Sequence, residues 1–366
     1  MNIPLVDLKA QYATIKDEID GAIRSVIEKT AFIGGPFAAK FESEFAAYIG
    51  ADHCVGVGNG TDALVMALKG LDLKPGDEVI VPALTFIATS EAVTLAGGKV
   101  VFADVDPRTR NLDPAAVEAA VTERTRALIP VHLYGRPADM DAFCALGKKH
   151  GLTVIEDGAQ AQGARIDSRR AGSCAAMGCF SFYPGKNLGA YGDAGAVILS
   201  DPEMAEKVRM LANHGRLAKY GHIYEGTNSR LDGLQGAVLS VKLKHLDDWN
   251  AARRKAARTY RERLQGLDLT LPQDHPGHVY HLFVIETDRR DELLAHLKEK
   301  GVGASIHYPD ALPRLKAYEY LGHREGEFPN AEKLAATILS LPIYAEITEE
   351  QQEYVIGRVR SFFGKG

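Results

Sequence analysis

Apolar and polar positions in the first half of the chain alternate between short hydrophobic runs and longer amphipathic stretches. Short apolar runs, typical of buried strands, occur at residues 54–57, 79–82, 100–102, 127–131 and 152–155. Stretches with helical spacing lie at residues 61–70, 90–95, 114–121 and 138–150. Strands that alternate with helices in this way predict crossover connections and a mainly parallel sheet.

The pattern changes after residue 177. Two strand-like stretches, 178–182 and 194–198, flank a glycine-rich loop that contains Lys186. A helix is predicted to begin at Asp201-Pro202 and to end near Gly215, because Asp caps helices and Pro suits their first turn.

A long helical pattern from Leu231 to about Leu264 suits a helix that links two domains. After it, strands are predicted around residues 279–285 and 302–306, and helices near 291–300, 331–339 and 349–359. The length of 366 residues also favours two domains. We therefore expect a large domain over residues 1–245, including an N-terminal helical segment, and a smaller C-terminal α/β domain over residues 246–366.

Composition and charge narrow the class of protein. Hydrophobic residues make up 46% of the chain and charged residues 25%, as in ordinary globular proteins. The net charge of −5 gives no support for nucleic-acid or anionic-membrane binding. No apolar run approaches the roughly 20 residues of a membrane span, and the first residues lack the pattern of a secretory signal. We expect a soluble cytoplasmic protein.

The four cysteines, Cys54, Cys144, Cys174 and Cys179, form no C-x-x-C pair and have no histidine cluster nearby. We expect thiols of a reducing compartment and no metal site.

A glycine-rich turn at residues 57–63 enters the first predicted helix. Its free backbone N–H groups and the helix dipole would favour a phosphate, and the Thr61 hydroxyl adds a donor. Gly56, Gly58 and Gly60 resemble a dinucleotide fingerprint with the wrong spacing. An ordinary helix cap explains the turn equally well, and an NAD(P)-dependent sugar reductase remains an alternative.

A carboxylate and an aromatic side chain follow two predicted strands, where open α/β sheets bind ligands. Asp157 comes after the run 152–155 and could keep the pyridine nitrogen of pyridoxal phosphate (PLP) protonated. Phe86 follows the run 79–82 and could stack on a planar cofactor. A helix cap and a core phenylalanine are the ordinary alternatives for these two residues.

Lys186 lies in the tight turn Pro184-Gly185-Lys186-Asn187. Desolvation in such a turn would lower the pKa of the lysine and favour Schiff-base formation. Ser181, in the same segment, can donate a hydrogen bond to a phosphate. A lone lysine is more often exposed on the surface, so the turn indicates a cofactor site only together with the other features.

Together these segments resemble the DegT/DnrJ/EryC1/StrS sugar aminotransferase family, which is PLP-dependent and has the fold-type I architecture. The resemblance covers nearly the whole chain and rests on residues 58–64, 154–161, 181–189, 228–232 and 306–309. It implies an α/β fold with a mainly parallel mixed sheet in the large domain and a smaller C-terminal α/β domain.

The resemblance also implies roles for individual residues around the PLP ring. Lys186 would form the Schiff base and move the proton, and Asp157 would pair with the pyridine nitrogen. Gln160 would lie near the phenolic oxygen, and Phe86 would stack on the ring.

Phosphate and substrate contacts follow from the same resemblance. Gly60, Thr61 and Ser181 would hold the phosphate, and Asn228 would reach it from the neighbouring subunit of a homodimer with shared active sites. The sugar or its acidic group would contact three further positions, for which His307 has a structural role as its alternative: Arg230, His307 and Tyr308.

Lys186 separates amino transfer from dehydration, since relatives that remove a hydroxyl carry histidine there. We expect transfer from L-glutamate to a nucleotide-linked keto sugar, with pyridoxamine phosphate formed during turnover. The segments are more similar to members that act at C3, with dTDP-3-keto-6-deoxyhexoses and UDP-linked 3-keto uronic acids both open. A 4-keto aminotransferase and a non-catalytic PLP-binding regulator are the remaining alternatives.

Overall fold

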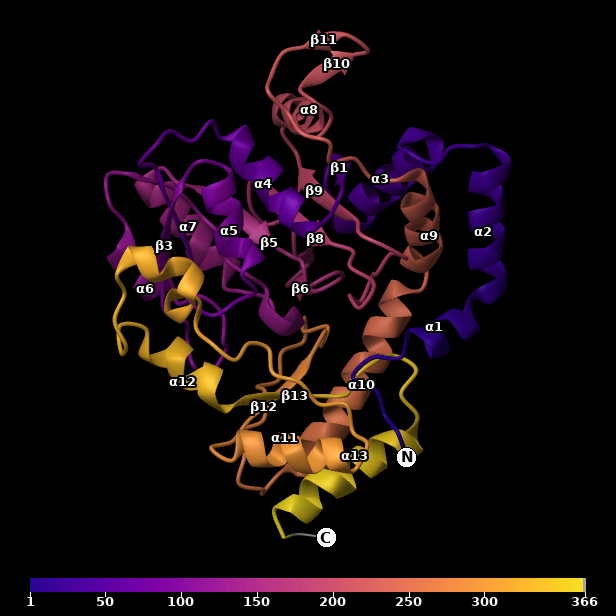
Figure 1. Ribbon diagram of the computed structural model, residues 1–366, viewed down its shortest axis with the longest axis vertical. Helices are drawn as coiled ribbons and strands as arrows, with labels where there is room; N and C mark the ends of the chain where they lie inside the picture. The colour runs from indigo at the N-terminus through magenta and orange to yellow at the C-terminus, as the bar shows by residue number, and fades with distance from the viewer. Residues whose placement is uncertain (365–366) are drawn as a thin grey trace.

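A seven-stranded mixed sheet forms the centre of the larger part of the molecule (Figure 1). The computed structural model describes residues 1–364. The strands lie in the order β1-β9-β8-β5-β4-β2-β3. Their bounds are β1 (His53–Val57), β2 (Glu78–Pro82), β3 (Lys99–Ala103), β4 (Thr125–Leu128), β5 (Thr153–Asp157), β8 (Met177–Ser181) and β9 (Gly195–Leu199). Only β9 is antiparallel to its neighbours in this sheet, so the predicted mainly parallel mixed sheet is confirmed.

Helices cover both faces of this sheet. One face packs against α4 (Gly60–Gly70), α5 (Ala88–Leu95) and α8 (Pro202–Leu211). The other face packs against α3 (Gly35–Ile49), α6 (Pro114–Ala120), α7 (Met140–His150) and α9 (Gly233–Leu243). The division follows from the strand period of two, which turns successive side chains to opposite faces.

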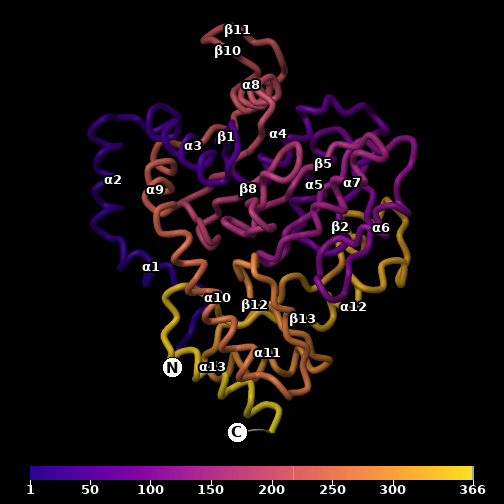
Figure 2. Tube along the Cα trace, turned by 180° about the vertical axis from the view of Figure 1, so that it is seen from behind, coloured from indigo at the N-terminus to yellow at the C-terminus, as the bar shows by residue number. Residues whose placement is uncertain are grey.

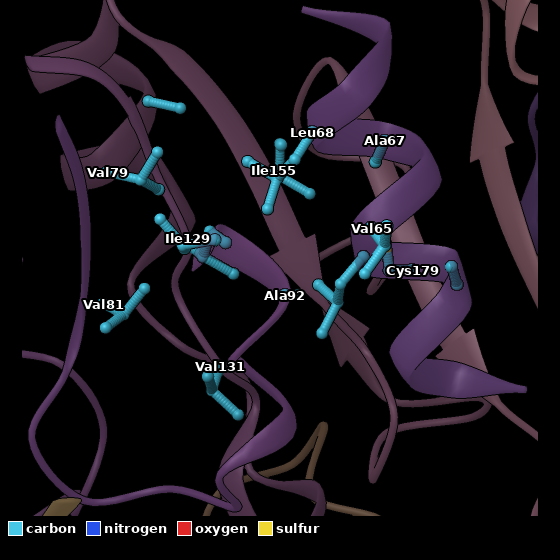
Figure 3. Packing of buried hydrophobic residues seen from close by; sticks show 14 of the residues in the cluster. Val65, Ala67, Leu68, Val79, Val81, Ala92, Ile129, Val131, Ile155 and Cys179 are labelled. Atoms are coloured by element: carbon cyan, nitrogen blue, oxygen red, sulfur yellow. The ribbon is translucent and has the colours of Figure 1, made fainter. Parts of the chain in front are cut away.

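Strand β2 illustrates this alternation. Val79 and Val81 join the hydrophobic cluster under α4 and α5, whereas Ile80 joins the cluster under α6 and α7. Figure 3 shows Val79 and Val81 with other buried side chains of the first cluster, among them Leu68 of α4. Burying an aliphatic side chain of this size contributes about 1.5–3 kcal/mol, so the central sheet is a rigid platform for the loops at its edge.

The N-terminal helix α1 (Leu8–Thr14) leads into α2 (Lys16–Glu28), which lies beside α9 in both views (Figures 1 and 2). Residues before them cross to the smaller part of the molecule, where Ile3 is fully buried in the core and forms a bridge with Val302. The chain therefore begins in contact with its C-terminal part.

The smaller part is reached through α10 (Leu246–Leu264). It contains the antiparallel pair β12 (Phe283–Glu286) and β13 (Ile338–Leu341), covered by α11 (Arg290–Glu299) and α13 (Glu349–Phe362), and α12 (Pro329–Thr337) leads into β13. The remaining regular elements are two short strand pairs and three 3-10 turns: β6 (Arg165–Ile166), β7 (Arg169–Arg170), β10 (Arg216–Ala218), β11 (Gly221–His222), η1 (Leu133–Gly135), η2 (Leu312–Arg314) and η3 (Lys316–Leu321). We continue to propose a domain boundary at residues 245–246.

Several predicted elements differ from the structure. The predicted helix 231–264 is two helices, α9 and α10, and the first turn of α10 contains two acidic residues, which favour a helix N-terminus. The predicted helix 331–339 ends at Thr337, because Ile338 and Leu339 pair with β12. The predicted strand 302–306 makes only isolated bridges.

The β10–β11 hairpin extends from the end of α8 beyond the rest of the molecule (Figures 1 and 2). Helix α8 itself ends at Leu211, four residues before the predicted end at Gly215. The hairpin exposes Tyr220, which is 83% accessible.

No helix within residues 1–364 combines the length and the apolar character that crossing a bilayer would require.

Candidate active site

A cavity of about 680 Å³ lies beyond the carboxyl ends of β5 and β8. Nine of the residues singled out in the sequence line it: Gly60, Thr61, Phe86, Asp157, Gln160, Ser181, Lys186, His307 and Tyr308. The first seven come from the larger part of the molecule and the last two from the smaller part. The structure therefore brings most of the predicted site together in one place.

The N-terminus of α4 forms one wall of this cavity. Asn59 caps the helix, because its side-chain oxygen accepts a hydrogen bond from the N–H of Asp62 at 2.8 Å. Gly60 and Thr61 lie in the first turn, where backbone N–H groups have no acceptor within the helix. A Cβ atom at Gly60 would lie only 2.5 Å from the Cβ of Ser181, so the close approach of these two segments requires glycine. Backbone N–H groups and two hydroxyl groups thus surround a position suited to a phosphate.

Asp157 ends β5 and is 4% exposed. Its carboxylate accepts hydrogen bonds from the Thr89 hydroxyl at 2.8 Å and from the N–H of Ala159 at 3.1 Å. Burial raises the pKa of Asp157, and these two hydrogen bonds oppose the shift, as does the charge of Lys186. Within residues 1–364 the carboxylate forms no ion pair, so it can accept a hydrogen bond from a protonated ring nitrogen in the cavity.

Glu156, the preceding residue, has the opposite orientation and does not line the cavity. It is fully buried and accepts hydrogen bonds from His132 at 2.9 Å and from three backbone N–H groups at residues 172–175. The Nδ1 atom of His132 accepts a hydrogen bond from the N–H of Ala138, so its Nε2 carries the proton that is donated to Glu156. Glu156 is therefore a structural residue beside the candidate catalytic carboxylate.

Lys186 lies in a loop fixed by backbone contacts. Its N–H donates to the carbonyl of Tyr183 at 2.8 Å, and a Cβ atom at Gly189 would lie 2.2 Å from the carbonyl oxygen of Pro184. The side chain faces the cavity, and burial lowers its pKa to about 8, partly opposed by Asp157. No described residue forms a hydrogen bond with the amino group of Lys186. An uncharged, unpartnered amine is a good nucleophile for an aldehyde.

Gln160 is held in one orientation at the edge of the cavity. Its side-chain oxygen accepts the N–H of Tyr134 at 2.6 Å, and its amide donates to the hydroxyl of Tyr308 at 3.1 Å. The ring centroids of Tyr308 and Phe86 are 5.7 Å apart, and Phe86, which lines the cavity, is 52% exposed. These contacts form an aromatic and amide edge that suits a planar heterocycle.

His307 lines the cavity and also has a structural partner, because its Nδ1 lies 2.8 Å from the hydroxyl oxygen of Ser340. Burial lowers the pKa of His307 to about 4, so the ring is neutral near pH 7.

Asn228 and Arg230 lie outside the cavity of their own chain. Asn228 is exposed and forms an isolated bridge with Asn213. Arg230 lies 3.4 Å from the side-chain oxygen of Asn213. Their predicted contacts with phosphate and sugar remain predictions.

Two residues of the site were not predicted from the sequence. Thr89 holds Asp157, and Tyr134 holds Gln160 and donates to the carbonyl of His307. Thr89 follows a predicted strand by a few residues, so the rule that ligands bind at strand ends gave a usable signal. Tyr134 gave none, because its backbone conformation, with φ of 60°, is visible only in the structure.

Comparisons with known proteins are consistent with this geometry. The model of the DegT/DnrJ/EryC1/StrS aminotransferase family matches residues 13–360. A pleiotropic regulatory protein of Geobacillus stearothermophilus is 48% identical, over 99% of both chains. A dTDP-3-amino-3,4,6-trideoxy-alpha-D-glucose transaminase of Streptomyces venezuelae is 48% identical, over 98% of this chain and 96% of the relative. The crystal structure of S. venezuelae DesV in complex with a ketimine intermediate has a TM-score of 0.97 at 47% identity, covering 100% of this chain and 99% of the other.

Proposed function

The chain belongs to the DegT/DnrJ/EryC1/StrS aminotransferase family, and we propose that it transfers the amino group of L-glutamate to C3 of a nucleotide-linked keto sugar. The observation that carries this proposal is the convergence of Lys186, Asp157 and the N-terminus of α4 on one cavity. An amine, a buried carboxylate and an anion-binding turn are what a PLP-dependent aminotransferase needs from its protein.

The residues present fit PLP, and the fit can be stated group by group. Gly60, Thr61 and Ser181 would hold the phosphate, and Asp157 would hold the protonated pyridine nitrogen. Gln160 would lie at the phenolic oxygen, and Phe86 would contact the ring. When bound, PLP supplies an electron-accepting ring that stabilises the negative charge left on the substrate carbon after proton removal.

The work of the chain in this reaction is to position groups and move a proton. Lys186 would bind the cofactor covalently in the resting enzyme and, once released, would accept the α-proton of the amino donor. Its lowered pKa of about 8 suits this exchange, because the amine is then available both as base and as acid near neutral pH. Asp157, held by Thr89, would keep the ring nitrogen protonated throughout. Ping-pong kinetics should follow from the two half-reactions.

The keto-sugar substrate is proposed from the relatives. The S. venezuelae transaminase is named for a dTDP-linked 3-amino sugar and matches nearly the full length of both chains. A dTDP-3-keto-6-deoxyhexose is therefore the first substrate to test, with a UDP-linked 3-keto uronic acid as the second. Transfer to C4 of a 4-keto sugar remains the alternative for the position of the new amino group.

We further propose a homodimer with shared active sites. Asn228 is exposed and lies outside the cavity of its own chain, which supports a contact with the cofactor phosphate of a second copy. The projecting β10–β11 hairpin is a neighbouring element that is free to contact that copy.

An amino-transfer assay tests the proposed function. The holoprotein is incubated with L-glutamate and matched 3-keto and 4-keto sugars linked to dTDP or UDP, and 2-oxoglutarate and aminosugar are quantified. We expect stoichiometric formation of both products with a 3-keto sugar. Product with 4-keto sugars alone would move the reaction to C4. A holoprotein that binds PLP but converts no sugar would support the regulatory alternative.

A further inference from the structure

A second cavity, of about 220 Å³, adjoins the first one and shares five lining residues with it, including Lys186, His307 and Tyr308. Its own lining adds Arg253 from α10 and His281 from the loop before β12. Lys186 therefore stands between two cavities, and the function proposed above uses only the larger one.

Arg253 is an unusual residue for the wall of a small cavity, because its side chain is only 4% exposed. Its Nη1 donates to the carbonyl oxygens of Tyr280 at 3.2 Å, His281 at 3.4 Å and Ile343 at 2.9 Å. These three contacts fix the guanidinium through one of its nitrogens. Among the described residues, none accepts a hydrogen bond from its Nε or Nη2. The N–H groups on these two nitrogens can therefore donate to a ligand.

The charges around this cavity favour an anion. Of the described residues that line it, none is Asp or Glu. Burial lowers the pKa of His281 well below its usual value and that of His307 to about 4, so both imidazoles are neutral near pH 7. Glu346 interacts with Arg253 at longer range, and burial raises the pKa of that carboxyl. Arg253 is thus a buried cation without a paired carboxylate.

We propose that Arg253 binds a carboxylate group of the amino donor in the smaller cavity, an inference that rests on the proposed aminotransferase function. A carboxylate accepts two parallel hydrogen bonds from a guanidinium, and the interaction is strong where water is excluded. The volume corresponds to about seven water molecules, which suits a short acid and is small for a nucleotide. The cavity also reaches Lys186, where the amino group of the donor must react.

The carboxylate of a uronic acid substrate is the competing source of the same chemistry. The two sources are distinguished by asking which ligand requires Arg253 for binding. An amino donor is represented by glutarate, a dicarboxylic acid that cannot react because it lacks an amino group. The sugar is represented by UDP-glucuronate.

The test measures equilibrium dissociation constants of glutarate and UDP-glucuronate for the holoprotein by titration calorimetry. We expect Arg253→Gln to weaken glutarate binding about 10- to 100-fold, since a buried charge-assisted pair is lost, and to change UDP-glucuronate binding little. Arg253→Lys should give an intermediate loss, because it keeps the charge without the fork. Unchanged glutarate binding, or a loss confined to UDP-glucuronate, would overturn the proposal.

A matched control separates binding from folding. Arg110 is also 4% exposed, bonds to Glu286 and to the carbonyl of Val284, and lines neither cavity. Arg110→Gln should lower the melting temperature without changing the affinity for glutarate.

If the Arg253 variants do not fold, a crystal structure of the unaltered holoprotein with glutarate decides the question. A carboxylate within hydrogen-bond distance of Arg253 supports the inference, and a carboxylate bound elsewhere contradicts it. Failure of the inference is distinct from failure of the proposed function. An active aminotransferase whose affinity for glutarate does not depend on Arg253 would contradict the inference and leave the proposed function intact.

Discussion

At the scale of single residues, the adjacent carboxylates Glu156 and Asp157 show how the strand period separates two tasks. Glu156 accepts four hydrogen bonds from the protein and does not line the cavity, whereas Asp157 faces the cavity with two protein donors. The same charge therefore stabilises the fold at one position and can serve chemistry at the next.

Isosteric amide substitutions distinguish these tasks. We expect Asp157→Asn to lower the rate of amino transfer about 100-fold or more, because it removes the charge that would hold the ring nitrogen protonated, while leaving the melting temperature nearly unchanged. Glu156→Gln should instead lower the free energy of unfolding by about 2–4 kcal/mol, since charge-assisted hydrogen bonds become weaker or unpaired. Steady-state kinetics and urea titration measure the two effects. Equal loss of stability in both variants would contradict the assignment.

The pKa of Lys186 gives a pH dependence with a definite sign. Burial lowers this pKa to about 8, so the reactive neutral amine predominates above pH 8 and falls about tenfold per unit below it. The rate at which the cofactor-free protein captures PLP should rise with pH up to about 8 and then flatten. Stopped-flow absorbance between pH 6 and 10 measures it.

The control for this profile is Lys186→Ala, because a second buried lysine, Lys242, also has a pKa lowered to about 8. A rate that keeps rising beyond pH 9.5, as for an ordinary lysine, would contradict the lowered pKa of Lys186.

At the scale of elements, the tight loop after β8 determines where Lys186 points. Gly189 lies against the carbonyl of Pro184, and its own carbonyl accepts a hydrogen bond from the buried amino group of Lys242 on α9. A Cβ atom at Gly185, by contrast, would meet nothing closer than the Tyr183 ring at 3.7 Å. The loop is therefore rigid at its end and open at its middle.

Two alanine substitutions test this description of the loop. Gly189→Ala should displace the loop and weaken PLP binding at least tenfold, because its Cβ has no room beside the Pro184 carbonyl. Gly185→Ala, four positions closer to β8 in the same loop, should bind PLP nearly as the unaltered protein does. Absorbance titration of the cofactor-free variants measures both affinities, and similar affinities would argue against a rigid loop.

Sequence periodicity predicted the parts of the fold that are local. The apolar runs of β2 and β5, the glycine-rich turn at Gly60 that enters α4 and the position of Asp157 at a strand end all follow from neighbouring residues. Sequence did not predict that Ile338 and Leu339 pair with β12 rather than extend α12, because that pairing joins segments about fifty residues apart. Sequence also does not show the burial of Arg253, because the three carbonyls that bind it come from segments distant in the chain.

At the scale of the whole molecule, the proposed shared active sites predict complementation between inactive chains. Lys186→Ala and Asn228→Ala should each be inactive or severely impaired as homodimers. In a mixed dimer, one site would combine both changes and the other would carry neither. Unfolding and refolding an equal mixture should therefore restore about a quarter of the activity, the value for random pairing of two chains. Absence of recovery in a mixture that contains mixed dimers would contradict sharing of Asn228.

We propose that Lys186 binds PLP covalently, and chemical trapping tests this attachment most directly. The holoprotein is reduced with borohydride, digested, and analysed by tandem mass spectrometry. We expect one phosphopyridoxyl group on the peptide that contains Lys186, and none on Lys242 or in the Lys186→Ala variant. A protein that retains no label, or carries it on another lysine, would contradict covalent binding of PLP by Lys186.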